Sequence, residues 1–222
     1  MIKFQGNGQT YEGYLARSVN GKGIGIIVIQ EWWGLVGHIK DVCDRFAEEG
    51  FTSLAPDLYH GQKTTDPDTA GKLMMALNIG EAEKVLRGAV LRLLEDEATV
   101  GDKVGVVGFC MGGQLSLFAA CTNPQIGACV DYYGIHPNVQ PPFEKLNAPV
   151  LGFFAENDAY ASSEAVEALS NALESHGKEH EFITYPGTDH AFFNNERPEV
   201  YNQGAAEDTW KRMVTFFRTN LG

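Results

Sequence analysis

The feature that most constrains the fold is a regular alternation of apolar strands with amphipathic helices. Ile24 to Ile29 is apolar on both faces, as expected for a central strand of a parallel sheet. From Gly37 to Glu49 apolar residues recur at helical spacing, and Gly50 is placed to end that helix. Phe51 to Ala55 is then a short strand stopped by Pro56. This pattern predicts a mostly parallel sheet with helices on both faces.

The alternation continues to the C-terminus, and a hairpin precedes it. The expected later elements are strands at 103–108, 126–132, 149–154 and 180–185, and helices at 66–97 (with a break near 78–80), 111–120, 162–175 and 204–217. Two short alternating segments flank Asn7-Gly8, which predicts antiparallel N-terminal strands joined by a tight turn. The irregular stretch 134–148 is too short for a cap domain. We therefore expect one α/β domain over residues 1–222.

Composition restricts the partners of this chain. Its formal net charge of -12 lacks the basic footprint that nucleic acids and anionic membranes require. No apolar run is long enough for a membrane span or a signal peptide, so we expect a cytoplasmic protein. Four cysteines without a CxxC pair indicate reduced thiols. We expect a small-molecule partner, no cofactor, and a monomer more than an obligate oligomer.

The stretch GFCMGG, residues 108–113, lies at a predicted strand-to-helix turn. Its glycines are spaced as in the G-x-S-x-G nucleophile elbow, with Cys110 at the serine position. Cysteine is often buried, so a G-x-C-x-G alone fits a packing thiol about equally well. The helix that begins near Met111 favours a nucleophile, because its N-terminus would stabilise a thiolate. The other cysteines, Cys43, Cys121 and Cys129, lack such a setting and are interpreted as packing residues.

A thiolate nucleophile needs a base and a group that orients the base. Asp158 follows the predicted strand 149–154, and His190 follows the strand 180–185, in the chain order of α/β-hydrolases. Glu156 remains an alternative acid, whereas Asp189 should point away from its neighbour His190. His176 and His180 are separated by a glycine that interrupts the helix, so we expect no metal site.

The stretch QEWWG, residues 30–34, follows the first buried strand. α/β-Hydrolases supply an oxyanion-hole N–H at this place, so the N–H groups of Trp32 and Met111 are candidates for that role. Glu31 is either a solvated loop charge, which is the commoner case, or an acid placed near the thiol.

Several of these motifs together resemble the dienelactone hydrolase family, the cysteine branch of the α/β-hydrolase fold. The resemblance covers the chain from about Gly25 onwards and rests on QEWWGL, APDLYHG, GFCMGG, DYYG, the strand ending in Asp158, and GTDHAF. It implies a triad of Cys110, Asp158 and His190. It also implies that Glu31 contacts the resting cysteine and helps to ionise it when substrate arrives.

The resemblance is incomplete where the archetypal enzyme of the family binds the substrate carboxylate with two arginines. The residues after His190 are Ala191, Phe192, Phe193 and Asn194, the stretch 61–73 contains no arginine, and Arg197 is the nearest basic residue downstream. An apolar substrate pocket is predicted instead from loop-end aromatics, namely Trp32, Trp33, Tyr59, Tyr133, Phe192 and Phe193.

The sequence thus predicts a hydrolase of lactones or small activated esters that works through a thioester. Two alternatives stay open. One is a general carboxylesterase or thioesterase acting on a neutral substrate. The other is a thiol redox-sensing or binding protein on a hydrolase scaffold, with Cys110 as an oxidisable thiol.

Overall fold

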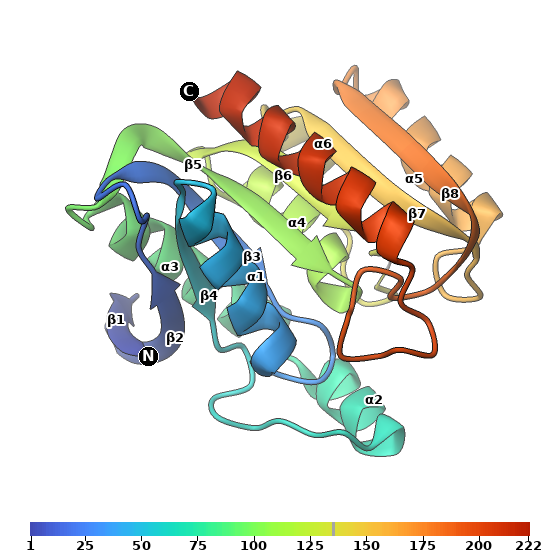
Figure 1. Cartoon of the computed structure of the whole chain (residues 1–222), viewed down its shortest axis with the longest axis horizontal. Coiled ribbons are helices and arrows are strands. Elements are labelled where there is room, and N and C mark those ends of the chain that lie inside the picture. The colour runs from blue at the N-terminus through green and yellow to red at the C-terminus, as the bar shows by residue number, and fades with distance from the viewer. Residues whose placement is uncertain (135) are drawn as a thin grey trace.

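Eight strands form one sheet in the order β1-β2-β4-β3-β5-β6-β7-β8. The computed structural model describes residues 1–134 and 136–222 (Figure 1). The strands are β1 (Ile2–Gly6), β2 (Gln9–Ala16), β3 (Gly23–Ile29), β4 (Thr52–Pro56), β5 (Thr99–Phe109), β6 (Ile126–Tyr132), β7 (Val150–Asn157) and β8 (His180–Asp189). Strands β4, β3, β5, β6, β7 and β8 run parallel to one another, as the alternation of strands and helices predicts.

The N-terminal strands are antiparallel to the rest. β1 pairs with β2 through a two-residue turn in which Asn7 and Gly8 have φ values of 52° and 82°. Asparagine and glycine are the residues that tolerate two successive positive φ values, so this turn type fits the dipeptide. β2 then pairs antiparallel with β4. The predicted hairpin is confirmed.

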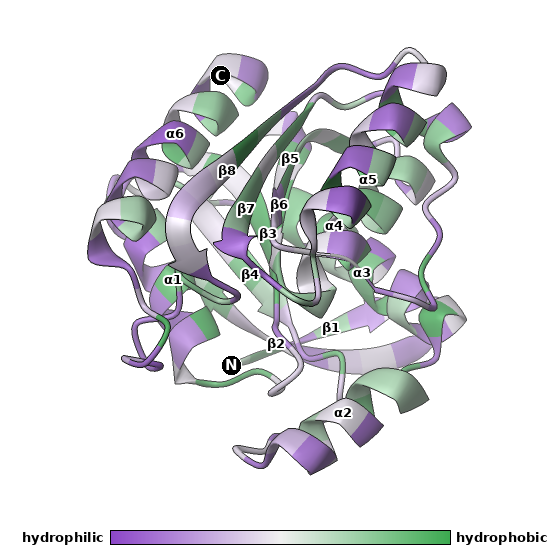
Figure 2. Cartoon of the chain, turned by 90° about the vertical axis from the view of Figure 1, so that its right-hand side faces the viewer, coloured by the Kyte–Doolittle hydropathy of each residue, from purple (hydrophilic) through white to green (hydrophobic). Residues whose placement is uncertain are grey.

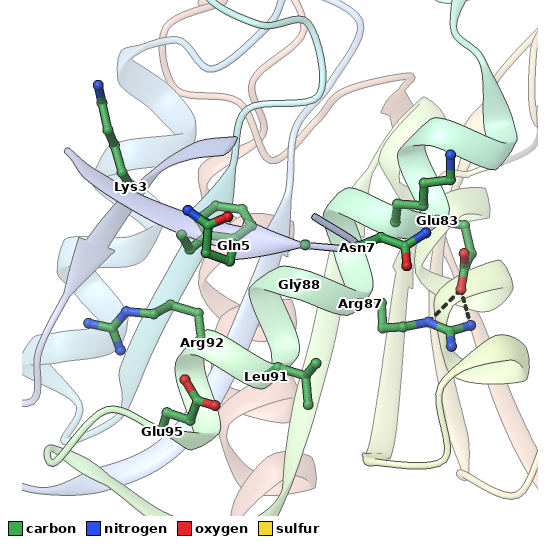
Figure 3. Close-up of a pocket in the computed structure, with 12 residues that line it drawn as sticks. Lys3, Gln5, Asn7, Glu83, Arg87, Gly88, Leu91, Arg92 and Glu95 are labelled. Carbon is green, nitrogen blue, oxygen red and sulfur yellow. Dashed lines mark hydrogen bonds and ion pairs between the residues drawn. The ribbon is translucent and has the colours of Figure 1, made fainter. Parts of the chain in front are cut away.

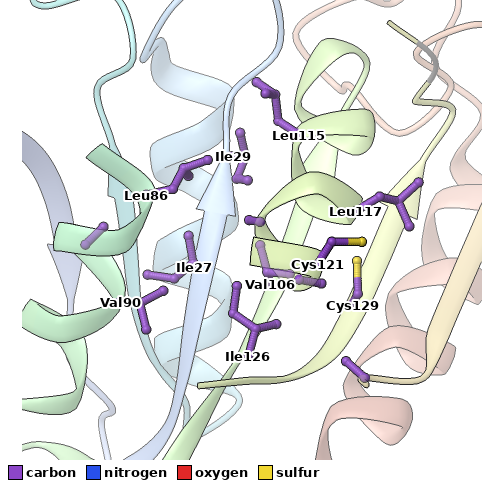
Figure 4. Close-up of a cluster of buried hydrophobic side chains, with 14 of the residues drawn as sticks. Ile27, Ile29, Leu86, Val90, Val106, Leu115, Leu117, Cys121, Ile126 and Cys129 are labelled. Carbon is purple, nitrogen blue, oxygen red and sulfur yellow. The ribbon is translucent and has the colours of Figure 1, made fainter. Parts of the chain in front are cut away.

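Helices cover both faces of the sheet. They are α1 (Gly37–Glu48), α2 (Pro67–Ala76), α3 (Ile79–Leu94), α4 (Met111–Thr122), α5 (Ser163–Ser175) and α6 (Gln203–Leu221). Side chains of α1 and α6 pack in one buried cluster, and those of α3, α4 and α5 pack in a second cluster on the other face. Figure 2 shows the apolar strands between the two layers, and Figure 4 shows part of the second cluster. The predicted fold class, an α/β-hydrolase fold with antiparallel N-terminal strands, is confirmed.

Element boundaries differ from prediction where strands leave the core. β5 begins at Thr99, four residues before the predicted start, because its first residues pair with β3 although they are mostly exposed. β8 continues to Asp189 for the same reason, since most of its side chains are at least partly exposed at the sheet edge. The long helical segment is indeed broken: Asn78 caps α3 by accepting a hydrogen bond from the Glu81 N–H at 3.0 Å.

The carboxyl edge of the parallel strands carries no cap domain in the part of the chain that the structure describes. Between β6 and β7 the described residues form one short helical turn, η1 (Phe143–Lys145). The helix α2 fully buries Ala70 alone among its residues and has Gly71 beside the ring of Trp32, which follows the carboxyl end of β3. None of the helices in the described ranges is both long and apolar enough to cross a bilayer.

Candidate active site

Cys110 occupies a sharp turn between β5 and α4. Its φ of 56° and ψ of -123° lie outside the regions that side-chain-bearing residues ordinarily adopt. Two glycines make the turn possible: a Cβ at Gly108 would collide with the carbonyl oxygen of Gly112, and a Cβ at Gly112 would lie 2.6 Å from the carbonyl oxygen of Ile29. The chain therefore packs α4 directly against the ends of β3 and β5 and leaves Cys110 at the corner.

Cys110 differs from the other three cysteines in exposure. It is partly exposed at the N-terminus of α4, whereas Cys43, Cys121 and Cys129 are buried. Burial raises the pKa of Cys43 and of Cys121 to about 12, and it raises the pKa of Cys129 as well. These three thiols stay protonated in the core, which confirms their interpretation as packing residues.

His190 and Asp158 are in direct contact. The imidazole Nδ1 lies 2.6 Å from Asp158 Oδ2, and Asp158 Oδ1 accepts hydrogen bonds from the N–H groups of Tyr160 (2.8 Å) and Ala161 (2.9 Å). Burial alone would raise the pKa of the Asp158 carboxyl, but the imidazole and these N–H groups hold it below its ordinary value. The carboxylate is thus ionised and fixed in orientation.

The charge of His190 follows from its neighbours. Burial would lower its pKa, but the hydrogen bond to Asp158 and the adjacent Cys110 raise it to about 10. An imidazole with this pKa holds a proton at neutral pH, and Asp158 fixes Nδ1–H toward itself so that Nε2 is left for the thiol. The three predicted triad residues therefore lie together at the carboxyl ends of β5, β7 and β8.

The rival acids have other contacts. Glu156 Oε2 accepts a hydrogen bond from the Gly187 N–H at 2.8 Å, and the side chain of Asp189 is exposed. His176 and His180 contact Ala172 and Ser170 separately. Within residues 1–134 and 136–222, no group of His, Cys, Asp and Glu side chains is arranged to hold a metal ion.

Glu31 is buried in the site, with 1% of its surface exposed, and is not a solvated loop charge. Its Oε2 accepts a hydrogen bond from Asn194 Nδ2 at 2.7 Å, and Asn194 Oδ1 in turn accepts from the Glu196 N–H at 3.0 Å, which fixes the amide orientation. Among the described residues, Glu31 Oε1 has no hydrogen-bond partner. Burial raises the pKa of Glu31, and Asn194, His190 and Arg197 oppose the rise.

Asn194 is the site residue that sequence reasoning missed. The only signal was its place four residues after His190, within the stretch where an arginine was sought and not found. Its role depends on a contact with a residue 163 positions away, which no local pattern reveals.

The two predicted oxyanion-hole residues lie at neighbouring strand ends. Met111 is the first residue of α4, so its N–H has no acceptor within the helix. Trp32 follows β3, which pairs with β5 up to the Ile29–Gly108 position. Among the described residues, the N–H of Trp32 has no hydrogen-bond acceptor. Both N–H groups are available at the edge that carries Cys110.

The predicted aromatic pocket is only partly exposed. Trp32 and Trp33 are partly exposed and meet edge to face at 5.0 Å, and the Arg197 guanidinium lies 5.8 Å from the centre of the Trp33 ring. Tyr59 is buried and its hydroxyl donates to Met111 Sδ at 3.2 Å. Tyr133 is buried against His190, with 5.0 Å between the ring centres.

Phe192 and Phe193 correct the pocket prediction. Their side chains expose 0% and 1% of their surface and belong to the core cluster under α1 and α6. The ring of Phe193 stacks on that of Phe109 at 5.2 Å. Both phenylalanines are therefore packing residues, because the chain turns inward directly after His190.

A hollow of about 670 Å³ lies elsewhere, between β1 and α3 (Figure 3). Its lining contains none of the predicted site residues, and several of its charged side chains are paired on the surface, as Arg87 is with Glu83. This hollow is separate from the chemistry around Cys110.

Comparisons with known proteins identify the family of this chain. The family model described as "Dienelactone hydrolase family" matches residues 11–221. The chain belongs to the dienelactone hydrolase family. Like the members of that family, it is a hydrolase of esters or lactones that acts on small molecules.

Individual relatives match almost end to end. "Protein usf" of Aquifex pyrophilus is 37% identical over all of this chain and 98% of its own length. A protein of Aquifex aeolicus named "Putative carboxymethylenebutenolidase" is 33% identical with the same coverage. The crystal structure titled "Putative Dienelactone Hydrolase" from Klebsiella pneumoniae is 30% identical, covers 98% of both chains and superposes with a TM-score of 0.87.

The substitution Asp158→Asn should lower the pKa of His190 from about 10. The expected drop is roughly 1–3 units, because the variant loses a charged partner while burial still disfavours the imidazolium. Titration of the His190 ring signals by NMR measures the change, with His190→Asn used to assign them. Glu156→Gln is the matched control and should leave the titration as it is, whereas an unaltered His190 pKa in Asp158→Asn would contradict the assignment.

Proposed function

We propose that this chain hydrolyses lactones or small activated esters with Cys110 as nucleophile, His190 as acid and base, and Asp158 as the group that orients the imidazole. The observation that carries the proposal is a thiol at a left-handed turn facing an imidazole that is hydrogen-bonded to a buried carboxylate. A packing thiol needs neither the strained turn nor that partner.

The reaction proceeds in two halves. His190 Nε2 carries the proton that Cys110 Sγ gives up, so the sulfur attacks the substrate carbonyl as a thiolate. The N–H groups of Met111 and Trp32 bind the oxyanion, which collapses to a thioester as the alcohol leaves with the proton from His190. His190 then takes a proton from water, which cleaves the thioester and releases the carboxylic acid and the free thiol.

Replacement of Cys110 by alanine should reduce turnover of p-nitrophenyl acetate or an enol-lactone to the uncatalysed rate. Intact-mass analysis of the parent protein during turnover should show an acyl adduct on Cys110. Cys121→Ala serves as the control, because that thiol is buried away from the turn. Retained turnover in Cys110→Ala would contradict the assignment of Cys110 as the nucleophile. A reactive thiol that forms no acyl adduct would favour the redox-sensing alternative.

Glu31 is proposed to help ionise Cys110, since it is buried beside the triad with one carboxyl oxygen unpartnered among the described residues. Glu31→Gln keeps the shape of the side chain and removes its acid–base capacity, so acylation should slow by at least roughly 100-fold. Pre-steady-state release of p-nitrophenol measures this step. The control is Glu196→Gln, which removes an exposed carboxylate from the loop that carries Asn194. Equal acylation rates in Glu31→Gln and the parent would return Glu31 to a structural role.

A second candidate is esterase or thioesterase activity on neutral substrates, and Arg197 distinguishes it from hydrolysis of carboxylate-bearing lactones. Arg197 is partly exposed, lies over Trp33 and lowers the pKa of Glu31, so it is the cation nearest to the site that these contacts identify. It also pairs with the exposed Glu199.

If the substrate carries a carboxylate, Arg197→Gln should lower kcat/KM for a carboxylate-bearing lactone by roughly ten-fold or more while sparing its neutral ester. Steady-state kinetics on the matched pair give the answer. Equal loss on both substrates, or none on either, would favour the neutral substrate.

The proposed chemistry also bears on location. A thiolate nucleophile has to stay reduced, and disulfides are rare in the cytosol. We place the protein in the cytoplasm on this ground, with a small-molecule substrate and no cofactor, acting as a monomer.

A further inference from the structure

Cys110 and Tyr133 lie side by side at the ends of neighbouring strands. Phe109 of β5 pairs with Tyr132 of β6, so the next residue of each strand stands at the same level of the carboxyl edge. The Cys110 N–H donates to the Tyr132 carbonyl at 3.0 Å, and the Tyr133 N–H donates to the Phe153 carbonyl at 2.8 Å. The sheet hydrogen bonds thus continue one residue beyond both strands.

The backbone of Tyr133 is turned as sharply as that of Cys110. Its φ is 43°, an uncommon value for a residue with a bulky side chain. Strand alternation would place Tyr133 on the same face as Cys129 of β6. The turn reverses this: its ring packs instead against His190 at 5.0 Å and against Phe192 at 5.4 Å between ring centres.

Among the described residues, the buried O–H of Tyr133 donates to no acceptor, and the backbone of Phe193 is the hydrogen-bonding group that approaches its oxygen. The residue exposes 1% of its surface, and within the described residues Tyr133 Oη takes part in no hydrogen bond of normal geometry. A buried hydroxyl without a partner is unfavourable, so such groups in native structures call for an explanation. Tyr133 thus combines a strained backbone with a hydroxyl donor that has no acceptor among the described residues.

The side chains around Cys110 indicate which group the Tyr133 hydroxyl can bind. Three titratable side chains interact with Cys110, namely Tyr59, Tyr133 and His190. Glu31 in turn interacts with Tyr133 and His190. Tyr59 already donates to Met111 Sδ. Glu31 Oε2 accepts from Asn194, and Glu31 Oε1 has no partner among the described residues. Burial, followed by the charges of Glu31 and Cys110, raises the pKa of Tyr133 well above its ordinary value. Tyr133 therefore keeps its proton throughout and is the donor still free to bind a negative charge at sulfur.

We propose that Tyr133 is a further catalytic residue whose hydroxyl donates a hydrogen bond to Cys110 Sγ when the sulfur is ionised. The inference rests on the proposed function, since it concerns the same nucleophile. The thiol proton goes to His190, the electron pair stays on sulfur, and the phenolic O–H of Tyr133 remains intact. When the new C–S bond forms, the hydroxyl is released from the sulfur, which no longer carries the charge.

The test is Tyr133→Phe, which keeps the ring, its packing on His190 and the strained backbone, and removes the donor. The readout is the pH dependence of Cys110 alkylation by iodoacetamide, followed by intact mass. Loss of the hydrogen bond should move the midpoint of this profile upward by about one pH unit, equivalent to about 1.36 kcal/mol.

The two limbs of the profile should change in opposite directions. Below the parent midpoint the variant should react about three-fold more slowly, because fewer of its thiols are ionised. On the alkaline plateau it should react about three-fold faster, because a less stabilised thiolate is the stronger nucleophile. A packing defect has no reason to produce this crossover.

Tyr132→Phe is the matched control. Tyr132 is also a buried tyrosine with an unpartnered hydroxyl, but its surroundings are Thr209 and Arg45 and not the thiol. The pH profile of Cys110 alkylation in Tyr132→Phe should coincide with that of the parent. The melting temperatures of the parent and both variants should agree, which would confirm a common fold.

An unaltered profile in Tyr133→Phe would overturn the inference, and so would an equal shift in Tyr132→Phe. These failures differ from failure of the proposed function. In that case Cys110→Ala would still turn over substrate, whatever the alkylation profile of Cys110 in the other proteins.

Discussion

The left-handed backbone at Cys110 is the constraint on which the rest of the site depends. A residue with a side chain adopts this conformation only where surrounding contacts hold it. Here those contacts come from the close approach of α4 to β3 and β5, which Gly108 and Gly112 allow because they have no Cβ. With the thiol at the corner, the remaining groups are placed by the register of the sheet: each follows the end of a different parallel strand, and all of them meet at one edge.

Burial then sets the charges at that edge. It disfavours ions, yet the site keeps an ionised Asp158 because His190 and two backbone N–H groups are bonded to it. Glu31 is the opposite case: its main partner is the neutral amide of Asn194, and its pKa is raised. The pKa values of two carboxyl groups of one site are thus shifted in opposite directions by the number and charge of their partners.

Much of this could be predicted from sequence, because apolar periodicity and the order of motifs are local signals. The strands that cross the core, the hairpin at Asn7-Gly8 and the convergence of Cys110, Asp158 and His190 all follow from such patterns. The exposed ends of β5 and β8 could not be predicted, since backbone pairing alone holds them.

Contacts between residues far apart in the chain set the other limit on prediction from sequence. An aromatic residue after a strand can face a ligand or the core with equal local preference, and Phe193 turned out to face the core. Asn194 and the idle hydroxyl of Tyr133 are defined by neighbours far away in the chain. Local sequence patterns therefore identify the residues of the proposed triad more readily than the residues that hold them in place.

The helix α2 has a consequence for how the site admits its substrate. It fully buries only Ala70 and packs Leu73 and Met74 partly against the core, while Gly71 lies beside the ring of Trp32 at the rim of the site. Segments with so few buried contacts open at a much lower free energy than the core strands. Amide hydrogens of α2 should exchange with solvent long before those of β5, so the wall of the site beside Trp32 can open while the strands that end at Cys110, Asp158 and His190 stay closed.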